Sequence, residues 1–172
     1  MRIILFRHGP AGSRDAARWP DDADRPLTQR GTARTRASAR GLARLAGPVT
    51  RIYSSPLERA RHTAELLRTA HGLDAPIEYL DALAPGGSFR EVLKTLSDCE
   101  ATEVVALVGH EPDLGKLAAI LVFGAPATTL ALKKAGACTI SFIGAPAPGE
   151  GRLTAFLPPR LLREARLKRS KA

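Results

Sequence analysis

The chain opens with a run of apolar positions at residues 3–6 that stops at Arg7 and His8. Consecutive apolar residues, most of them β-branched or aromatic, favour a strand that is covered on both faces of a sheet. A second β-branched run, at residues 103–108, leads directly to a glycine and His110. The pattern therefore predicts two buried strands, each of which places a histidine just beyond its end.

Between and after these two strands, small and apolar residues recur at helical spacing. The predicted helices cover residues 28–46, 56–71, 88–97 and 111–123, and further strands are predicted at residues 49–53, 77–80, 137–143 and 152–157. Strands that alternate with helices predict an α/β fold, a three-layer α/β/α sandwich with a mostly parallel central sheet. We find no internal repeat and no linker, so we expect one domain over residues 1–160. Residues 161–172 are expected to form a basic tail or a short helix.

Two helix starts carry local signals. Thr28 is a candidate N-cap for the first helix. At the second helix, Ser55 can cap, Pro56 suits the first helical position, and Glu58 completes a capping box. Arg59 is therefore expected in the first turn, beside the end of the preceding strand.

The segment 10–26 carries three aspartates, among them Asp22, and shows no sustained helical period. It is too long and too charged for a plain connector. Loops at strand ends often carry function. A surface excursion pinned by Trp19 explains the segment equally well.

The composition is that of a soluble protein and excludes few functions. The 172 residues are 44% hydrophobic and 25% charged, which is ordinary for a soluble domain. No apolar run approaches the length of a membrane span, and the N-terminus has no secretory signal, so we expect a cytoplasmic protein. Cys99 and Cys138 have neither disulfide-framework nor metal-ligand spacing, and are expected to be reduced thiols.

A formal net charge of +9 raises the possibility of a nucleic-acid partner. The excess is concentrated in the helix at residues 28–46 and in residues 160–172. No aromatic residues are interleaved with these arginines for base stacking, and a charged helix face is usually a solvated surface. We therefore expect no nucleic-acid partner and no membrane partner. An acidic protein or anionic lipid could contact the tail, but a frayed, solvated end is the simpler interpretation.

The chemistry-bearing residues follow three different strands. In open α/β sheets, ligands bind beyond the carboxyl ends of the strands. Arg7 and His8 follow one strand, Ser55 and Arg59 a second, and His110 a third. Two arginines and two histidines at one edge would form a pocket for a dianionic phosphoryl group. Two histidines could instead ligate zinc, but no third ligand has suitable spacing and the arginines would repel a cation. We expect no metal and no cofactor.

These residues lie in four motifs that occur in order along nearly the whole chain. The motifs are Arg7-His8-Gly9, Asp22-x-x-Arg25-Pro26-Leu27-Thr28-x-x-Gly31, Ser54-Ser55-Pro56-Leu57-x-Arg59-Ala60-x-x-Thr63-Ala64 and Val108-Gly109-His110-Glu111-Pro112. In them the sequence resembles the histidine phosphatase superfamily, and within it the short phosphohistidine phosphatases of the SixA type. The resemblance implies a phosphoglycerate mutase-like fold and a reaction that needs no metal.

The resemblance also implies roles for individual residues. His8 would be the nucleophile that forms a phosphohistidine intermediate, and Arg7, Arg59 and His110 would hold the phosphoryl oxygens. Asp22 is the candidate proton donor that the resemblance implies, because it stands three residues before Arg25-Pro26-Leu27-Thr28, as in the SixA type, and the Leu-x-Glu pattern of other superfamily members is absent. The expected substrate-binding residues are Arg7, Gly9, Arg25, Ser55, Arg59 and His110.

These roles set requirements on the two histidines. His8 must be neutral to attack phosphorus, so its other ring nitrogen needs a fixed acceptor, whereas His110 serves best as a protonated donor. The expected function is a phosphatase acting on phosphohistidine in a protein. A phosphomonoesterase acting on a small metabolite or nucleotide stays open, as does a phosphate-binding relative without turnover. The sequence does not specify the physiological substrate or the oligomeric state.

Overall fold

The computed structural model describes residues 1–126 and 130–165. Its centre is a six-stranded sheet in the order β3-β2-β4-β1-β5-β6. The strands are β1 (Arg2–Arg7), β2 (Arg51–Ser54), β3 (Glu78–Tyr79), β4 (Val104–Gly109), β5 (Ala137–Ser141) and β6 (Arg152–Leu157). Strands β1 to β4 run parallel to their neighbours in this group, whereas β5 is antiparallel to β1 and β6 is antiparallel to β5. The predicted, mostly parallel α/β sheet is confirmed.

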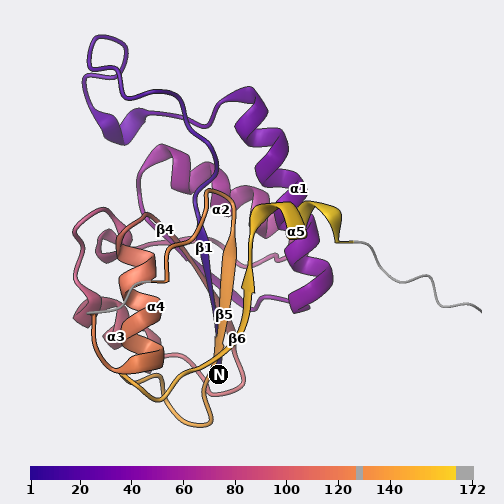
Figure 1. The fold of residues 1–172 in the computed structure, drawn as a ribbon, viewed down its shortest axis with the longest axis vertical. Helices are drawn as coiled ribbons and strands as arrows, with labels where there is room; N and C mark the ends of the chain where they lie inside the picture. Colours follow the sequence, from indigo (N-terminus) through magenta and orange to yellow (C-terminus); the bar gives the residue numbers. More distant parts are fainter. Residues whose placement is uncertain (127–129, 166–172) are drawn as a thin grey trace, which may run out of the picture.

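Helices cover both faces of the sheet (Figure 1). The helices are α1 (Gln29–Ala46), α2 (Glu58–His71), α3 (Phe89–Ser97), α4 (Asp113–Phe123) and α5 (Pro159–Glu164). Helices α1, α2 and α5 share one apolar core with the sheet, and α3 and α4 share the other. The alternation of β1 explains this: Ile3 and Leu5 enter the second core, while Ile4 and Phe6 enter the first. The central strand is therefore buried on both faces, and the fold has three layers.

The register of the parallel strands places the ends of β1, β2 and β4 at one edge of the sheet. Arg7 pairs with Gly109, and Ser54 pairs with Val108. The next residues continue the ladder: the His8 amide donates to the Gly109 carbonyl at 3.1 Å. The predicted convergence of three strand ends is confirmed.

The antiparallel strand β5 begins at the same edge where the parallel strands end. The Ala135 amide donates to the carbonyls of Arg7 and His8, at 3.1 and 3.2 Å. Lys134, the preceding residue, is therefore brought next to the end of β1.

One of the two predicted helix starts is confirmed and the other is wrong. The Thr28 hydroxyl caps α1 by accepting from the Gly31 amide at 2.9 Å. Helix α2 begins at Glu58, and its N-cap is Leu57 without a side-chain cap. Ser55 does not cap the helix, because it lies two residues before the cap position; its hydroxyl accepts from the Leu57 amide at 3.3 Å and contacts His110 Nε2 at 2.8 Å. Arg59 still lies in the first turn.

The start of the predicted basic tail packs on the domain. Helix α5 lies against α1, and Leu162 is 0% exposed. Gly41 permits this contact, because a Cβ there would overlap the Leu162 carbonyl. Residues 161–164 therefore belong to a short helix that is anchored by Leu162, while Leu161, Arg163 and Glu164 are exposed; residues 166–172 lie outside the described residues.

The surface and the cysteines agree with the composition. The five arginines of α1 at positions 30, 34, 36, 40 and 44 are exposed, as expected for a solvated helix face. Cys99 and Cys138 are free thiols. None of the helices in the described part of the chain combines the length and the apolar character that a bilayer crossing requires.

Candidate active site

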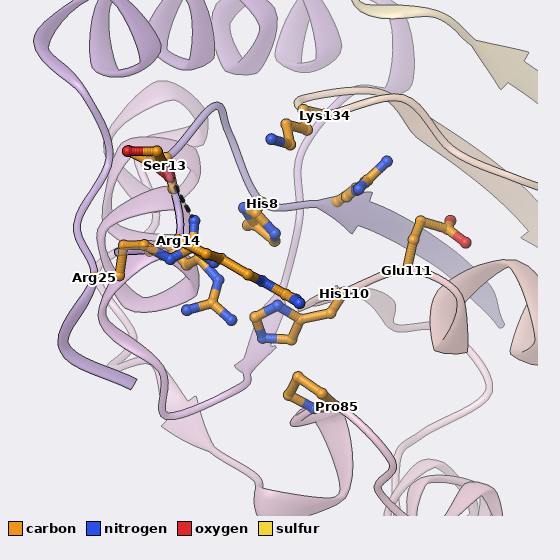
Figure 2. Close-up of a pocket in the computed structure, with 12 residues that line it drawn as sticks. His8, Ser13, Arg14, Arg25, Pro85, His110, Glu111 and Lys134 are labelled. Atoms are coloured by element: carbon orange, nitrogen blue, oxygen red, sulfur yellow. Dashed lines mark hydrogen bonds between the residues drawn. The ribbon is translucent and has the colours of Figure 1, made fainter. Parts of the chain in front are cut away.

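A cavity of about 350 Å³ opens at the carboxyl ends of β1 and β4 (Figure 2). Arg25 lines it together with the four residues that were expected to act directly on the phosphoryl group: Arg7, His8, Arg59 and His110. We call these four residues the phosphoryl cradle. They come from β1, from the loop after it, from the first turn of α2 and from the loop after β4. The topology of the sheet thus brings together residues that are distant in the sequence.

His8 is held in one tautomer at the floor of the cavity. Its ring is 6% exposed, and Nδ1 lies 2.7 Å from the Gly9 carbonyl oxygen. A carbonyl can only accept, so Nδ1 carries the proton and Nε2 keeps its lone pair. Burial lowers the pKa of His8 to about 3, and the charges of Arg59 and Arg7 act in the same direction. The ring is therefore neutral near pH 7.

His110 lies next to His8, with ring centroids 4.9 Å apart and an interplanar angle of 51°. Its Nε2 is 2.8 Å from the Ser55 hydroxyl. Burial, and then the proximity of His8, lower the pKa of His110 to about 3. The predicted protonated form is therefore disfavoured while the cavity holds no anion, and a phosphoryl dianion between the rings would favour it.

Arg59 and Arg25 are anchored by the same carboxylate. Arg59, which is 2% exposed, donates from Nη1 to the Asp22 carbonyl at 2.7 Å and pairs through Nη2 with Asp22 Oδ2 at 3.0 Å. Arg25 pairs through Nε with Asp22 Oδ1 at 2.8 Å. The hydrogen bond from Arg25 lowers the pKa of Asp22, and the charge of Arg59 lowers it further. Asp22 is thus ionised and holds both guanidinium groups in place.

Arg7 has a carboxylate counterpart on the opposite side of the cavity. Its Nη1 donates to the Leu132 carbonyl at 2.7 Å, and the Leu132 amide donates to Glu111 Oε1 at 2.8 Å. Figure 2 shows the Glu111 side chain at the margin of the site, directed away from His110. Glu111 therefore fixes the segment that orients Arg7, and its charge favours the protonated guanidinium.

Both cradle arginines have unused donor capacity. The Nε atoms of Arg7 and Arg59 are buried and have no hydrogen-bond partner within residues 1–126 and 130–165. Buried donors without partners are uncommon in folded proteins and call for an explanation. Together with the charges, they favour the binding of an oxyanion.

The other expected binding residues differ in their positions. Arg25 lines the cavity, whereas Gly9, Ser55 and Asp22 do not. Gly9 serves packing, because a Cβ there would overlap the Thr35 hydroxyl. Ser55 and Asp22 contact the cavity only through the side chains that they hold.

Two further cations line the cavity that the sequence interpretation missed: Arg14 and Lys134. Arg14 lies in the loop after β1. The sequence indicates that this loop is a candidate functional segment, but it does not single out Arg14. Lys134 precedes β5, and an antiparallel strand begins where parallel strands end. The two lysines at positions 133 and 134 precede the predicted strand at residues 137–143, but only the direction of that strand places Lys134 at the cavity.

The donor set is cationic rather than metal-ligating. No group of three or more His, Cys, Asp or Glu side chains suited to a metal ion occurs among the residues that the structure describes. Five cationic side chains line the cavity, Arg7, Arg14, Arg25, Arg59 and Lys134. Such a site attracts phosphoryl groups and other oxyanions.

Comparison with known sequences gives one matching family model and several relatives. A model of the histidine phosphatase superfamily (branch 1) matches residues 3–85. The chain is 43% identical over 138 residues to an uncharacterized protein of a Picosynechococcus species, covering 79% of this chain and 82% of that protein. It is 39% identical over 83 residues to the adenosylcobalamin/alpha-ribazole phosphatase of Salmonella typhimurium, covering 48% of this chain and 39% of that enzyme.

Solved structures agree with these matches. The protein histidine phosphatase SixA in complex with tungstate superposes with a TM-score of 0.80 at 28% identity, covering 94% of this chain and 99% of that one. A mycobacterial glucosyl-3-phosphoglycerate phosphatase with inorganic phosphate has the same fold, with a TM-score of 0.69 at 20% identity, covering 92% of this chain and 98% of that one. The chain is therefore a phosphatase that belongs to the histidine phosphatase superfamily.

Proposed function

We propose that this phosphatase is a protein phosphohistidine phosphatase of the SixA type, which works without a metal and uses His8 as its nucleophile. The observation that carries the proposal is the hydrogen bond from His8 Nδ1 to the Gly9 carbonyl. It leaves an unprotonated Nε2 in a cavity that Arg7 and Arg59 also line. A neutral imidazole beside two guanidinium groups suits attack on a phosphoryl group.

In the first step, His8 Nε2 forms a bond to phosphorus while the bond from phosphorus to the leaving group breaks. Arg7 and Arg59 hold the phosphoryl oxygens and neutralise their charge, which stabilises the transition state electrostatically. The incoming dianion raises the pKa of His110, so that this ring donates a hydrogen bond to the transferred group.

In the second step, water attacks phosphorus and the bond to His8 Nε2 breaks. One water proton passes to the solvent or to the departing phosphate, and His8 returns to its neutral tautomer. The hydrogen bond to Gly9 persists through both steps, so the ring does not reorient between them. Splitting hydrolysis in this way makes a covalent route available without a cofactor.

The way in which the leaving group obtains its proton supports phosphohistidine as the substrate. The hydrogen bond from Arg25 and the charge of Arg59 hold the pKa of Asp22 low, so its carboxyl group is ionised near neutral pH and carries no proton to donate. A phosphoramidate can be protonated on its leaving nitrogen before the bond breaks, so it needs less help than an ester. Proton donation by Asp22 stays a prediction for substrates with an oxygen leaving group.

The charge of the site supports metal independence. Arg7, Arg25 and Arg59 line the cavity, and their positive charges would repel a metal cation there. We expect full activity after treatment with EDTA. Loss of activity that added Mg²⁺ or Zn²⁺ restores would contradict this part of the proposal.

A second candidate function is a phosphomonoesterase for a small metabolite. The match to the Salmonella alpha-ribazole phosphatase favours it, although the match covers only 39% of that enzyme. A cavity of about 350 Å³ is also within the range of small-molecule sites.

A donor panel tests the proposal and separates the two candidates. Phosphate release is measured from a phosphohistidine-bearing protein, from p-nitrophenyl phosphate and from alpha-ribazole phosphate. We expect the phosphohistidine donor to show the highest kcat/KM, by at least about tenfold, and a higher value for either ester would favour the second candidate.

The nucleophile is tested in the same panel with His8→Ala. We expect release to fall by at least about a thousandfold for every donor. His62→Ala is the matched control, because His62 lies on α2 and does not line the cavity. Release by His8→Ala at the rate of the unmodified protein would contradict the proposal.

A further inference from the structure

The cavity extends beyond the phosphoryl cradle to two cations at its mouth. Arg14 comes from the loop after β1 and Lys134 from the segment before β5, and both side chains line the cavity. In Figure 2, Lys134 lies on one side of His8, while the Arg14 side chain reaches across the opening toward His110. We call Arg14 and Lys134 the rim.

The rim differs from the cradle in how its cations are held. Arg59 pairs with Asp22, and Arg7 donates to the Leu132 carbonyl. By contrast, neither rim cation forms an ion pair or a side-chain hydrogen bond with any residue of 1–126 and 130–165, although the charge of Arg14 acts on Asp22 from a distance. The rim cations therefore have no direct partner among the described residues.

The cations also repel one another. Partial burial lowers the pKa of Lys134, and the charges of Arg7, Arg25, Arg59 and Arg14 lower it further. Like charges gathered around one cavity destabilise the folded state unless an anion binds between them. A bound anion at the rim would relieve this repulsion.

The charge of one phosphoryl group does not balance the site. Five cationic side chains line the cavity, and Glu111 is the only acidic lining residue in the described chain. Asp22 does not line the cavity but pairs with Arg25 and Arg59, which do. These two carboxylates leave an excess of three positive charges. A phosphoryl group carries about two negative charges at neutral pH, so positive charge remains after it binds.

The volume also exceeds what one phosphoryl group needs. The cavity measures about 350 Å³, the liquid volume of roughly a dozen water molecules. A phosphoryl group held by Arg7, Arg59 and the two histidines fills only the inner part. The outer part, between Arg14 and Lys134, has room for another small charged group.

We propose that Arg14 and Lys134 form a second anion-binding position, and that the substrate carries a carboxylate or phosphate group close to the phosphoryl group that is transferred. This inference rests on the proposed function, because it assumes that the cradle takes the transferred group. Two sources would supply the second anion: an acidic side chain beside a phosphohistidine, or an acidic group on a phosphorylated metabolite.

Two phosphonates that cannot be hydrolysed test the second position directly. Methylphosphonate offers the cradle a phosphonate alone, and phosphonoacetate adds a carboxylate. Binding of both to the full chain is measured by calorimetry. We expect phosphonoacetate to bind about tenfold more tightly, the gain typical of one added charge-assisted contact.

Lys134→Ala and Arg14→Ala should each lower the ratio of the two dissociation constants by at least about threefold, and the double variant should bring it close to one. Lys133→Ala is the matched control, because it removes the same charge from an exposed neighbour that does not line the cavity. An equal loss in Lys133→Ala, or a ratio near one in the unmodified protein, would overturn the proposal.

Failure of the proposed function gives a different result. If methylphosphonate does not bind, the cradle does not hold a phosphoryl group and both proposals are wrong. If methylphosphonate binds and the carboxylate adds nothing, only the second position is wrong.

Turnover distinguishes the two sources of the second anion. Phosphohistidine peptides with Asp or with Ala beside the modified residue are compared with a phosphorylated hydroxy acid. A preference for the Asp peptide that Lys134→Ala removes identifies a protein source, and a preference for the hydroxy acid that the same variant removes identifies a metabolite source. The proposal would be contradicted if the protein preferred neither the Asp peptide over the Ala peptide nor the hydroxy acid over the peptides.

Discussion

The cradle and the rim line the same cavity, but they are built differently. Arg59 in the cradle is almost fully buried and is held by two contacts to Asp22, at 2.7 and 3.0 Å. The rim residues Arg14 and Lys134 are exposed and have no anionic partner in the described chain. Contacts within the protein hold the cradle side chains in place, whereas the rim cations have no such contacts in the described chain.

This difference separates chemistry from selectivity. Preorganised donors stabilise the transition state because they need no rearrangement during the reaction. Exposed charges contribute to binding mainly where a ligand pairs with them. We therefore expect cradle substitutions to act on every substrate, and rim substitutions to act only on substrates with a second anion.

The largest effect is expected from Arg59→Lys. Lysine keeps the charge but loses the planar fork that contacts Asp22 and the phosphoryl group. We expect kcat/KM to fall by about 10²–10³-fold for phosphohistidine and ester donors alike, the range seen when an oxyanion donor is removed.

Arg61→Lys is the control for Arg59, because Arg61 is an exposed arginine on the same helix. Thermal unfolding followed by circular dichroism shows whether each variant is folded. A folded Arg59→Lys variant with normal kcat/KM would show that the Arg59 guanidinium does not stabilise the transferred phosphoryl group.

Asp22→Asn should have a smaller effect that depends on the leaving group. Loss of the carboxylate charge loosens Arg59 and Arg25, so we expect a loss of about tenfold with every donor. If Asp22 also donates a proton, p-nitrophenyl phosphate should lose less than an ester with a poorer leaving group, and phosphohistidine should lose least.

The comparison is made by steady-state kcat/KM on the three donors, with Asp24→Asn as the control from the same turn. Equal losses on all donors would contradict proton donation by Asp22 and leave it with its positioning role alone.

The smallest effect concerns pH and the buried histidines. Burial lowers the pKa of His8 and His110 to about 3, from 6.5 for an exposed histidine. Below pH 6.5 the unfolded chain therefore binds protons that the folded protein does not. The contribution of these two neutral rings to the free energy of unfolding is fully present above pH 6.5. It is lost as the pH falls toward 3, by at most about 1.4 kcal/mol per pH unit for each ring.

We expect the Tm of the ligand-free protein to fall by several degrees between pH 6.5 and pH 5. His110→Gln should show a shallower fall, because one of the buried rings that take up a proton on unfolding is gone. A Tm that does not change over this range would show that both rings are already charged or exposed.

The sequence predicts the cradle because each of its residues follows a locally recognisable element. The apolar run of β1 ends at Arg7, and the β-branched run of β4 ends near His110. A parallel sheet brings such ends together whatever the exact register. The prediction of Thr28 as a cap is confirmed for a similar reason, because its hydrogen-bond partner, the Gly31 amide, lies only three residues away.

Contacts between distant segments were harder to predict. Ser55 satisfies the local rule for a cap, but the tertiary contact to His110 determines its position. Lys134 reaches the cavity because β5 is antiparallel to β1, and sequence periodicity does not report strand direction. Arg14 lies in a loop without periodicity, so only the folded path of the loop reveals where its side chain points.

Trapping the covalent intermediate tests the central claim most directly. The protein is mixed with an excess of phosphodonor, quenched in alkali, in which phosphohistidine is stable, and mapped by mass spectrometry of its peptides. We predict a phosphoryl group on His8 during turnover, absent from His8→Ala. Steady turnover with no phosphorylated His8, or a phosphoryl group on His110 instead, would contradict the account.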